Sequence, residues 1–189
     1  CLLSRGLGDV YKRQYYDSHN KYLYHLTDTS GSWVRTSLED IGTNTGGTSL
    51  DIAIDPTTDQ PGISYFNMYQ NSLKYTYYTG STWSTPFEDN GADYGRYNSI
   101  VYDSVGNVHI SHEQNQADDL MYTSDKTGSW LTTPVDTASS VGLYTAIAVD
   151  SNDDLHIAYR YNSGSDTRHA TVQGYKTGSE ARTDVTGAT

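Results

Sequence analysis

Six residues with planar or aromatic side chains fall in segments that turn-forming residues mark as loops or strand ends. They are Tyr94, Arg96, Tyr97, Glu113, Tyr144 and Arg160. Tyrosine offers a flat apolar face, while guanidinium and carboxylate groups offer planar hydrogen bonding, and sugars need both. We therefore take these six as candidate carbohydrate-binding residues. Tyr97 and Tyr144 also recur in phase with the repeat described below, so packing at a strand entrance is the alternative role for them.

Metal binding and catalysis have weaker signals. Asp150, Asn152 and Asp154 have the spacing that begins a calcium loop, but the glycine and the distal glutamate of an EF-hand are missing. A polar hairpin turn explains these three residues better than a calcium site. His109 and His156 lack the spacing of zinc ligands, and we expect them to be hydrogen-bonded strand residues. We predict no catalytic residue, no metal and no cofactor.

An internal repeat organises the chain around these residues. Trp33, Trp83 and Trp130 lie 50 and 47 residues apart, each in a Gly-Ser-Trp or Gly-Ser-Thr-Trp phrase. A second series recurs at 48 and 47, consisting of Asp55, Asp103 and Asp150. Residues repeated in every unit are expected to hold the unit together. We predict that the aspartates accept backbone hydrogen bonds in turns. The tryptophans should anchor the packing, with sugar stacking as their less expected role.

Each repeat contains four short runs rich in Val, Ile, Tyr and Thr, bounded by turn formers, and none has a helical period. Four antiparallel strands in 47 to 50 residues are typical of a β-propeller blade. A β-sandwich is the alternative, although it requires no fixed period. We predict an all-β partial propeller of about three and a half four-stranded blades. Their approximate limits are 15–47, 48–96, 97–143 and 144–189.

The repeats resemble bacterial propellers of the sialidase-like superfamily, whose BNR or Asp-box motif turns between the third and fourth strands. Thr123–Trp130 is the best copy of that box, and the resemblance extends over about 15–186. The resemblance implies a propeller fold. It does not imply sialidase chemistry, because no motif assigns Arg96, Arg160, Arg168 or Glu113 to the arginine triad or acid/base roles.

The first fourteen residues, CLLSRGLGDVYKRQ, differ from the rest. They contain the only cysteine and three of the twelve basic residues. They resemble translated sequencing-adapter read-through, and they have no apolar stretch long enough for a secretory signal. We expect residues 1–14 to be non-native and residues 15–189 to be a propeller fragment cut within its first blade.

Composition limits the partners. The net charge of −11 argues against a nucleic-acid backbone as ligand, and no apolar run is long enough for membrane insertion. We predict a non-catalytic module that binds a glycan or cell-surface polymer and belongs to a secreted or cell-surface prokaryotic protein. One alternative is a structural or adhesive repeat that self-associates or packs with missing blades of a parent chain. A second is a fragment of a sialidase-like glycoside hydrolase.

Overall fold

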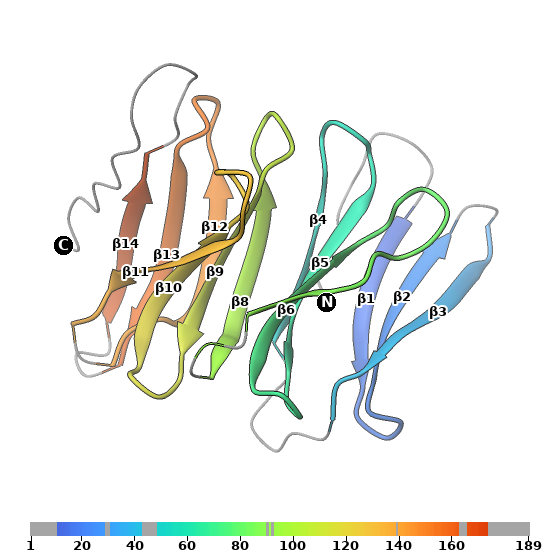
Figure 1. Ribbon diagram of the computed structural model, residues 1–189, viewed down its shortest axis with the longest axis horizontal. Coiled ribbons are helices and arrows are strands. Elements are labelled where there is room, and N and C mark those ends of the chain that lie inside the picture. The colour runs from blue at the N-terminus through green and yellow to red at the C-terminus, as the bar shows by residue number, and fades with distance from the viewer. Residues whose placement is uncertain are drawn as a thin grey trace.

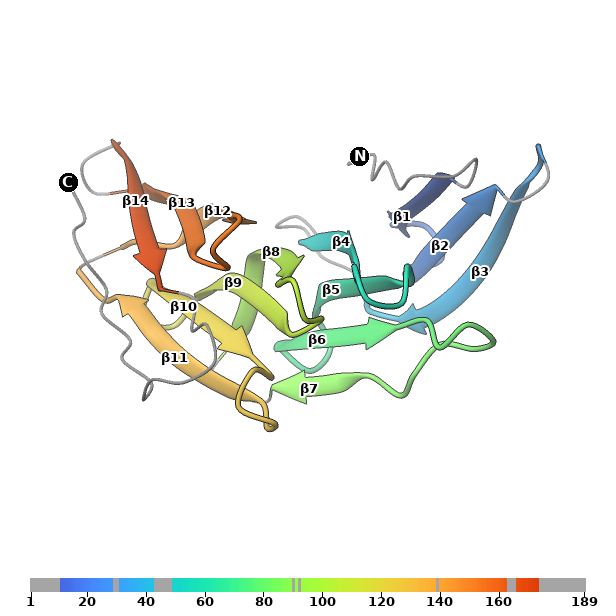
Figure 2. The same ribbon diagram turned by 90° about the horizontal axis from the view of Figure 1, so that it is seen from above.

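The computed structural model describes residues 11–28, 31–42, 49–89, 91, 93–138, 140–162 and 166–173. These residues form fourteen β-strands and no helix. The strands make four antiparallel sheets, and in each sheet consecutive strands pair with one another. The sheets follow each other in chain order along an open arc (Figures 1 and 2). The expected all-β class and antiparallel pairing are confirmed. Within the described residues, two sheets have the predicted four strands, the first and last have three, and the arc is not closed.

The strand bounds follow the repeat. The first sheet consists of β1 (Tyr11–Asp17), β2 (Tyr22–Asp28) and β3 (Trp33–Asp40). The second consists of β4 (Leu50–Ile54), β5 (Pro61–Asn67), β6 (Ser72–Tyr77) and β7 (Phe87–Asp89). The third consists of β8 (Tyr94–Tyr102), β9 (Val108–Gln114), β10 (Asp119–Ser124) and β11 (Leu131–Asp136). The fourth consists of β12 (Leu143–Val149), β13 (Leu155–Tyr161) and β14 (Asp166–Val172).

The first strand begins earlier than the composition shift predicts. Residues 11–14, part of the segment expected to be non-native, lie in β1 and pair with β2, with Gln14 opposite His25. β1 and β2 correspond in the repeat to β5 and β6 of the second sheet, and an equivalent turn joins the two strands of each pair. Among the described residues, the first strand of the first sheet therefore holds the place of a second strand in the repeat.

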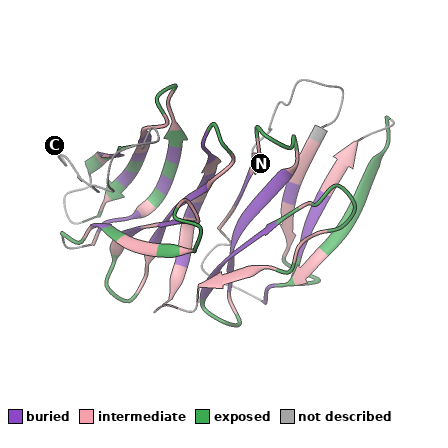
Figure 3. Cartoon of the chain, turned by 45° about the horizontal axis from the view of Figure 1, so that its top comes forward, coloured by how far each residue is buried: buried purple, intermediate pink, exposed green. Residues whose placement is uncertain are grey.

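Burial differs between the middle and the end of the arc. All seven residues of β5 are buried, since sheets lie on both of its sides. In β12 burial alternates, with Thr145 and Ile147 buried and Ala146 and Ala148 exposed. Figure 3 shows the exposed stripes on the two end sheets. Strict alternation is what one covered and one uncovered face produces.

The inner strands β4, β8 and β12 are joined to one another by side chains rather than by a ladder. The carboxylate of Asp51 accepts hydrogen bonds from the Ser99 hydroxyl (2.8 Å) and the Ile100 backbone N–H (3.0 Å). One repeat later, the Thr145 hydroxyl donates to the Tyr97 carbonyl at 2.7 Å. These bonds hold each sheet against the next near the axis of the arc.

Two glycines permit a close approach between neighbouring sheets. Gly95 is the second residue of β8 and Gly142 directly precedes β12, with φ of +107° and +87°. A Cβ on Gly95 would lie 2.7 Å from the Leu73 Cα, and one on Gly142 would lie 3.0 Å from the Leu120 Cα. No side chain fits there unless the preceding sheet moves.

We expect Gly95→Ala and Gly142→Ala to destabilise the fold more than Gly80→Ala. Gly80 also has a positive φ, +91°, but a Cβ there meets nothing within 4 Å. Gly80→Ala therefore measures backbone strain alone, about 1 kcal/mol, and the other two variants add a steric clash that brings the loss to about 2–3 kcal/mol. Urea denaturation measures all three. Equal losses would contradict the proposed close approach.

Candidate functional site

The start of β8 and the end of β9 bring three of the six predicted ligand-binding residues together. Arg96 lies opposite Glu113 in the strand register, and Tyr94 begins the same strand. The Tyr94 ring packs edge-on against His112, with 5.4 Å between ring centroids. Together with the adjacent Tyr97 and with Tyr144, which contacts Tyr97, these three residues make up the rim cluster: Tyr94, Arg96, Tyr97, Glu113 and Tyr144.

Glu113 is the one carboxylic acid of the rim cluster, and it is buried. Only 2 % of the residue is exposed, and burial, together with the nearby charge of Asp118, raises the pKa of its carboxyl to about 7. The Arg96 charge acts in the opposite direction, but its guanidinium forms an ion pair with Asp93 at 3.4 Å and lies 5.4 Å from the Phe66 ring. Arg96 is therefore already engaged, and about half of the Glu113 carboxyl remains protonated at pH 7.

Tyr97 and Tyr144 form an aromatic pair between the third and fourth sheets. Their ring centroids are 4.6 Å apart, and both residues have positive φ, 50° and 53°, which is rare for a bulky side chain. Tyr144 is 63 % exposed, whereas Tyr97 is partly covered, and this burial raises the pKa of Tyr97. Arg160 is exposed and pairs with Leu143, the residue before Tyr144. The sixth candidate therefore lies beside this pair.

The repeated aspartates point into their own turns. Asp55 Oδ1 accepts the Thr57 N–H at 2.8 Å. The Asp150 Oδ1 atom accepts the backbone N–H groups of Asn152 and Asp154 at 2.7 and 3.0 Å. Across the described ranges, no three His, Cys, Asp or Glu side chains are grouped so that they could hold a metal ion. His109 is 1 % exposed and contacts Asp103 at 3.3 Å and the Tyr122 hydroxyl at 2.6 Å.

The three repeated tryptophans have different surroundings. Trp33 is 44 % exposed, with the Arg13 guanidinium 5.0 Å from its ring. Trp130 is stacked on Phe87 at 4.0 Å between centroids. Trp83 packs against His25 at 5.0 Å and Tyr78 at 5.7 Å, and it also lines a cavity. The tryptophan at this repeat position therefore packs against neighbouring side chains, and in some copies it also lines a cleft.

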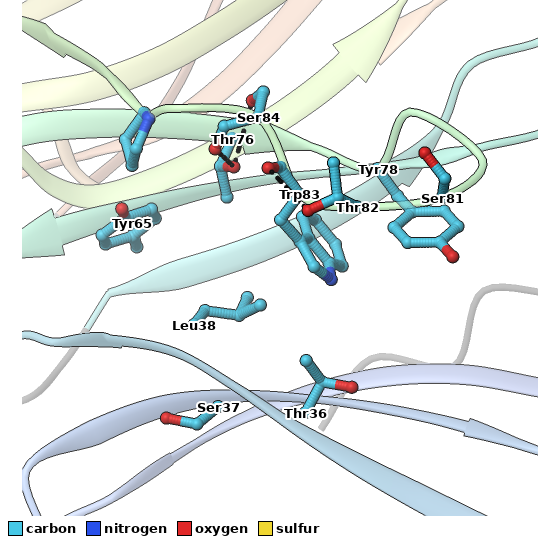
Figure 4. Close-up of a pocket in the computed structure, with 11 residues that line it drawn as sticks. Thr36, Ser37, Leu38, Tyr65, Thr76, Tyr78, Ser81, Thr82, Trp83 and Ser84 are labelled. Atoms are coloured by element: carbon cyan, nitrogen blue, oxygen red, sulfur yellow. Dashed lines mark hydrogen bonds between the residues drawn. The ribbon is translucent and has the colours of Figure 1, made fainter.

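The cavity beside Trp83 is a cleft of about 370 Å³ between β3 and the segment that follows β6 (Figure 4). We call it the Trp83 cleft. Aromatic and apolar surface comes from Trp83, Tyr78, Tyr65 and Leu38. Six hydroxyl side chains complete most of the wall: Thr36, Ser37, Thr76, Ser81, Thr82 and Ser84. No Asp, Glu, Lys or Arg lines it.

Hydrogen bonds fix the wall of the Trp83 cleft that belongs to the second sheet. The Thr76 hydroxyl donates to the Ser84 carbonyl at 3.0 Å, and the Tyr77 N–H donates to the Ser84 hydroxyl at 3.1 Å. Behind the cleft, the buried Tyr65 hydroxyl donates to Glu39, which also pairs with Lys74 at 2.6 Å. Thr36 and Ser37 on β3 are exposed at the opposite wall, which belongs to the first sheet. Ser81 and Thr82 are exposed as well, and a hydroxyl can donate one hydrogen bond and accept two, so the exposed part of the cleft suits a ligand with many hydroxyls.

A second cleft, of about 260 Å³, lies between the second and third sheets. Trp130, Tyr75, Tyr77 and Tyr102 supply its aromatic surface, and Asp55 and Asp125 lie in its wall. Both carboxylates are already bonded, Asp125 to the Val108 N–H at 2.8 Å and Asp55 within its turn. Because Phe87 also covers one face of Trp130, this cleft offers less free surface than the Trp83 cleft.

Sequence reasoning missed the Trp83 cleft. Its walls come from segments about forty residues apart in different sheets, and no single motif contains them. The hydroxyl-rich phrase Ser81-Thr82-Trp83-Ser84 was the available signal, because the other Gly-Ser-Trp phrases lack it. A third aspartate series was missed too: Asp40, Asp89 and Asp136 each accept the N–H two residues ahead, at 2.9 to 3.1 Å.

Comparisons with known proteins give no family. No family model matches the chain, and no curated protein matches it. Among solved structures, one similar chain is a fucose lectin from Kordia zhangzhouensis in complex with methyl-fucoside. It is 14 % identical, the match covers 72 % of this chain and 100 % of that one, and the TM-score is 0.43. A likeness at this level decides neither fold nor ligand. The described residues contain no helix that is long and apolar enough to cross a bilayer.

The buried Glu113 carboxyl should make the free energy of unfolding depend on pH. Its pKa of about 7 in the folded state exceeds the ordinary value of 4.5, so folding favours the protonated form. Ionising it as pH rises from about 4.5 through 7 therefore removes stability, and Glu113→Gln should escape that loss. We expect the two proteins to unfold with similar free energies at pH 5. At pH 8 the variant should gain up to about 3 kcal/mol relative to the wild type. Parallel curves in pH-dependent denaturation would contradict a Glu113 whose pKa is raised by burial.

Proposed function

We propose that this chain is a non-catalytic carbohydrate-binding module whose four sheets are blades of a β-propeller. The observation that carries the proposal is the Trp83 cleft, which combines a partly exposed indole with six hydroxyl side chains. Sugars present a C–H face to aromatic rings and hydroxyls at their edges, so this combination fits them. The volume, about 370 Å³, lies in the lower part of the range of roughly 300–1,000 Å³ found for small-molecule sites.

The lining also selects the kind of sugar. Because no charged side chain faces the Trp83 cleft, a carboxylated or sulfated glycan would lose hydration there without gaining a counter-charge. A neutral glycan has no such cost. The absence of Asp and Glu from the lining further favours binding over hydrolysis, since glycosidases flank the scissile bond with two carboxyl groups.

The rim cluster is the second candidate location for a bound glycan. Its exposed Tyr144 and the neighbouring Arg160 suit an extended ligand on the surface. Its Arg96, however, is already paired with Asp93, which also accepts a hydrogen bond from Asn115 at 2.6 Å. We therefore assign the first sugar to the Trp83 cleft.

Binding is tested with a glycan array followed by titration calorimetry on the best neutral glycan. Trp83→Ala should weaken binding by about tenfold or more, equivalent to about 1.4 kcal/mol, because the stacking surface is lost. Trp33→Ala is the matched control, since Trp33 holds the same repeat position but lies outside the cleft. Affinity should change little between low and high salt.

Three results would count against the proposal. An array with no neutral glycan bound would end the carbohydrate assignment. Unchanged affinity in Trp83→Ala, with loss in Tyr144→Ala, would move the site to the rim cluster. A strong salt dependence would show that charged groups outside the Trp83 cleft carry the binding.

A further inference from the structure

Two sheet faces at the ends of the arc are uncovered in the described structure. One is the face of β1–β3 that points away from the second sheet, and the other is the face of β12–β14 that points away from the third (Figures 2 and 3). Between them the chain contains three sheet-to-sheet interfaces built from equivalent positions. Those interfaces show what each uncovered face is shaped to meet.

In the first and third interfaces, a tyrosine and a cation of the following sheet bind a carboxylate on the last strand of the preceding sheet. Tyr65 and Lys74 bind Glu39, with the ammonium at 2.6 Å. Two repeats later, Tyr159 and Arg168 bind Asp136 at 2.7 and 3.2 Å. The strand registers place Tyr65 with Tyr159, and Lys74 with Arg168.

The middle interface reaches the preceding sheet with neutral groups. His112 takes the place of the tyrosine, and its Nε2 lies 2.8 Å from the Thr123 hydroxyl. Thr123 bonds Thr132 at 2.7 Å, and Thr132 donates to Asp89 of the second sheet. All three interfaces therefore end on a carboxylate of the preceding sheet's last strand.

The uncovered face of the first sheet presents the following-sheet half of this interface. Tyr15 occupies the position of Tyr65 and Tyr159. Arg35 supplies the cation: its Nη1 lies 3.4 Å from the Tyr15 hydroxyl, and its guanidinium lies 4.6 Å above the Tyr24 ring. Within the described ranges, no carboxylate oxygen lies within 4 Å of the Arg35 nitrogens, whereas Lys74 and Arg168 each have one.

The uncovered face of the fourth sheet presents the preceding-sheet half. Ala146 and Ala158, paired across β12 and β13, are both exposed. The equivalent pair in the third sheet, Ser99 and Ser111, is covered by β12, whose Ile147 N–H and Thr145 hydroxyl bond them. Alanine at both positions leaves no polar group in need of a partner, and it permits close approach of an apolar and aromatic sheet.

We propose that a second copy of this chain covers these faces, with β1–β3 of one copy packed on β12–β14 of the other. The two faces are opposite halves of one repeated interface, so each complements the other rather than itself. Such head-to-tail contacts build a ring where the rotation closes and an open chain where it does not. The interface extends the stacking of sheets inside one chain across the boundary between copies.

Blocking one face at a time tests this. Arg35→Glu reverses the cation on the first sheet, and Ala158→Arg places a long side chain on the fourth. Both residues are exposed, so neither change alters a core. Val105→Arg, at a 70 % exposed turn position, is the control. In sedimentation velocity, wild type and control should form larger species as concentration rises through the micromolar range. Each blocked variant alone should remain monomeric.

The decisive sample mixes the two blocked variants. Each retains one free face, so the mixture should form a one-to-one dimer that does not grow. Trp33→Glu and Ala146→Arg provide a second pair of blocks at exposed positions on the same faces. A wild type that stays monomeric, or a mixture that does not associate, would overturn the proposal. Association that persists in both single variants would do so too, since another surface would then be responsible.

Discussion

The contact between inner strands determines most of this structure. Side chains of β4, β8 and β12 bond the backbone of the neighbouring inner strand, as Asp51 does with the Ile100 N–H and Thr145 with the Tyr97 carbonyl. Burial raises the pKa of Asp51, while bonds from Ile100 and Ser99 favour its charged form. These short bonds hold the sheets together on one side only. The outer strands can then separate, and the Trp83 cleft is lined largely by such outer segments.

The repeat made the strands predictable, because turn residues and apolar runs recur together. The turns after Asp55, Asp103 and Asp150 lie where the sequence places them, and their carboxylates bond the backbone. Such features depend on residues within one repeat, so local chemistry is enough to find them. Arg96 and Glu113 could likewise be placed together, because both flank the same pair of strands.

What could not be predicted depends on contacts between repeats. The engagement of Arg96 with Asp93 rather than with Glu113 is a matter of side-chain direction. Thr36 and Ser37 gave no signal, since their role arises from the second sheet that faces them. The three tryptophans looked equivalent, yet Phe87 covers one, Arg13 lies over another and a cleft opens beside the third. A period in the sequence identifies equal positions, but neighbours in space decide what each position does.

The residues at equivalent repeat positions differ between sheets, and these differences distinguish positions that stabilise the fold from positions that could bind a ligand. Tyr65 and Tyr159 donate hydrogen bonds to carboxylates of the preceding sheet, whereas His112 reaches a carboxylate through two threonines. Burial lowers the pKa of His112 to about 4, so its ring is neutral at neutral pH. Interfaces of such different composition show that the repeat tolerates substitution wherever the hydrogen bonds are completed. The clefts between outer strands carry no such constraint and are free to specialise. If copies associate head to tail, one Trp83 cleft per copy would be repeated along the assembly. Weak binding of single sugars would then become strong binding of a polymer through effective concentration.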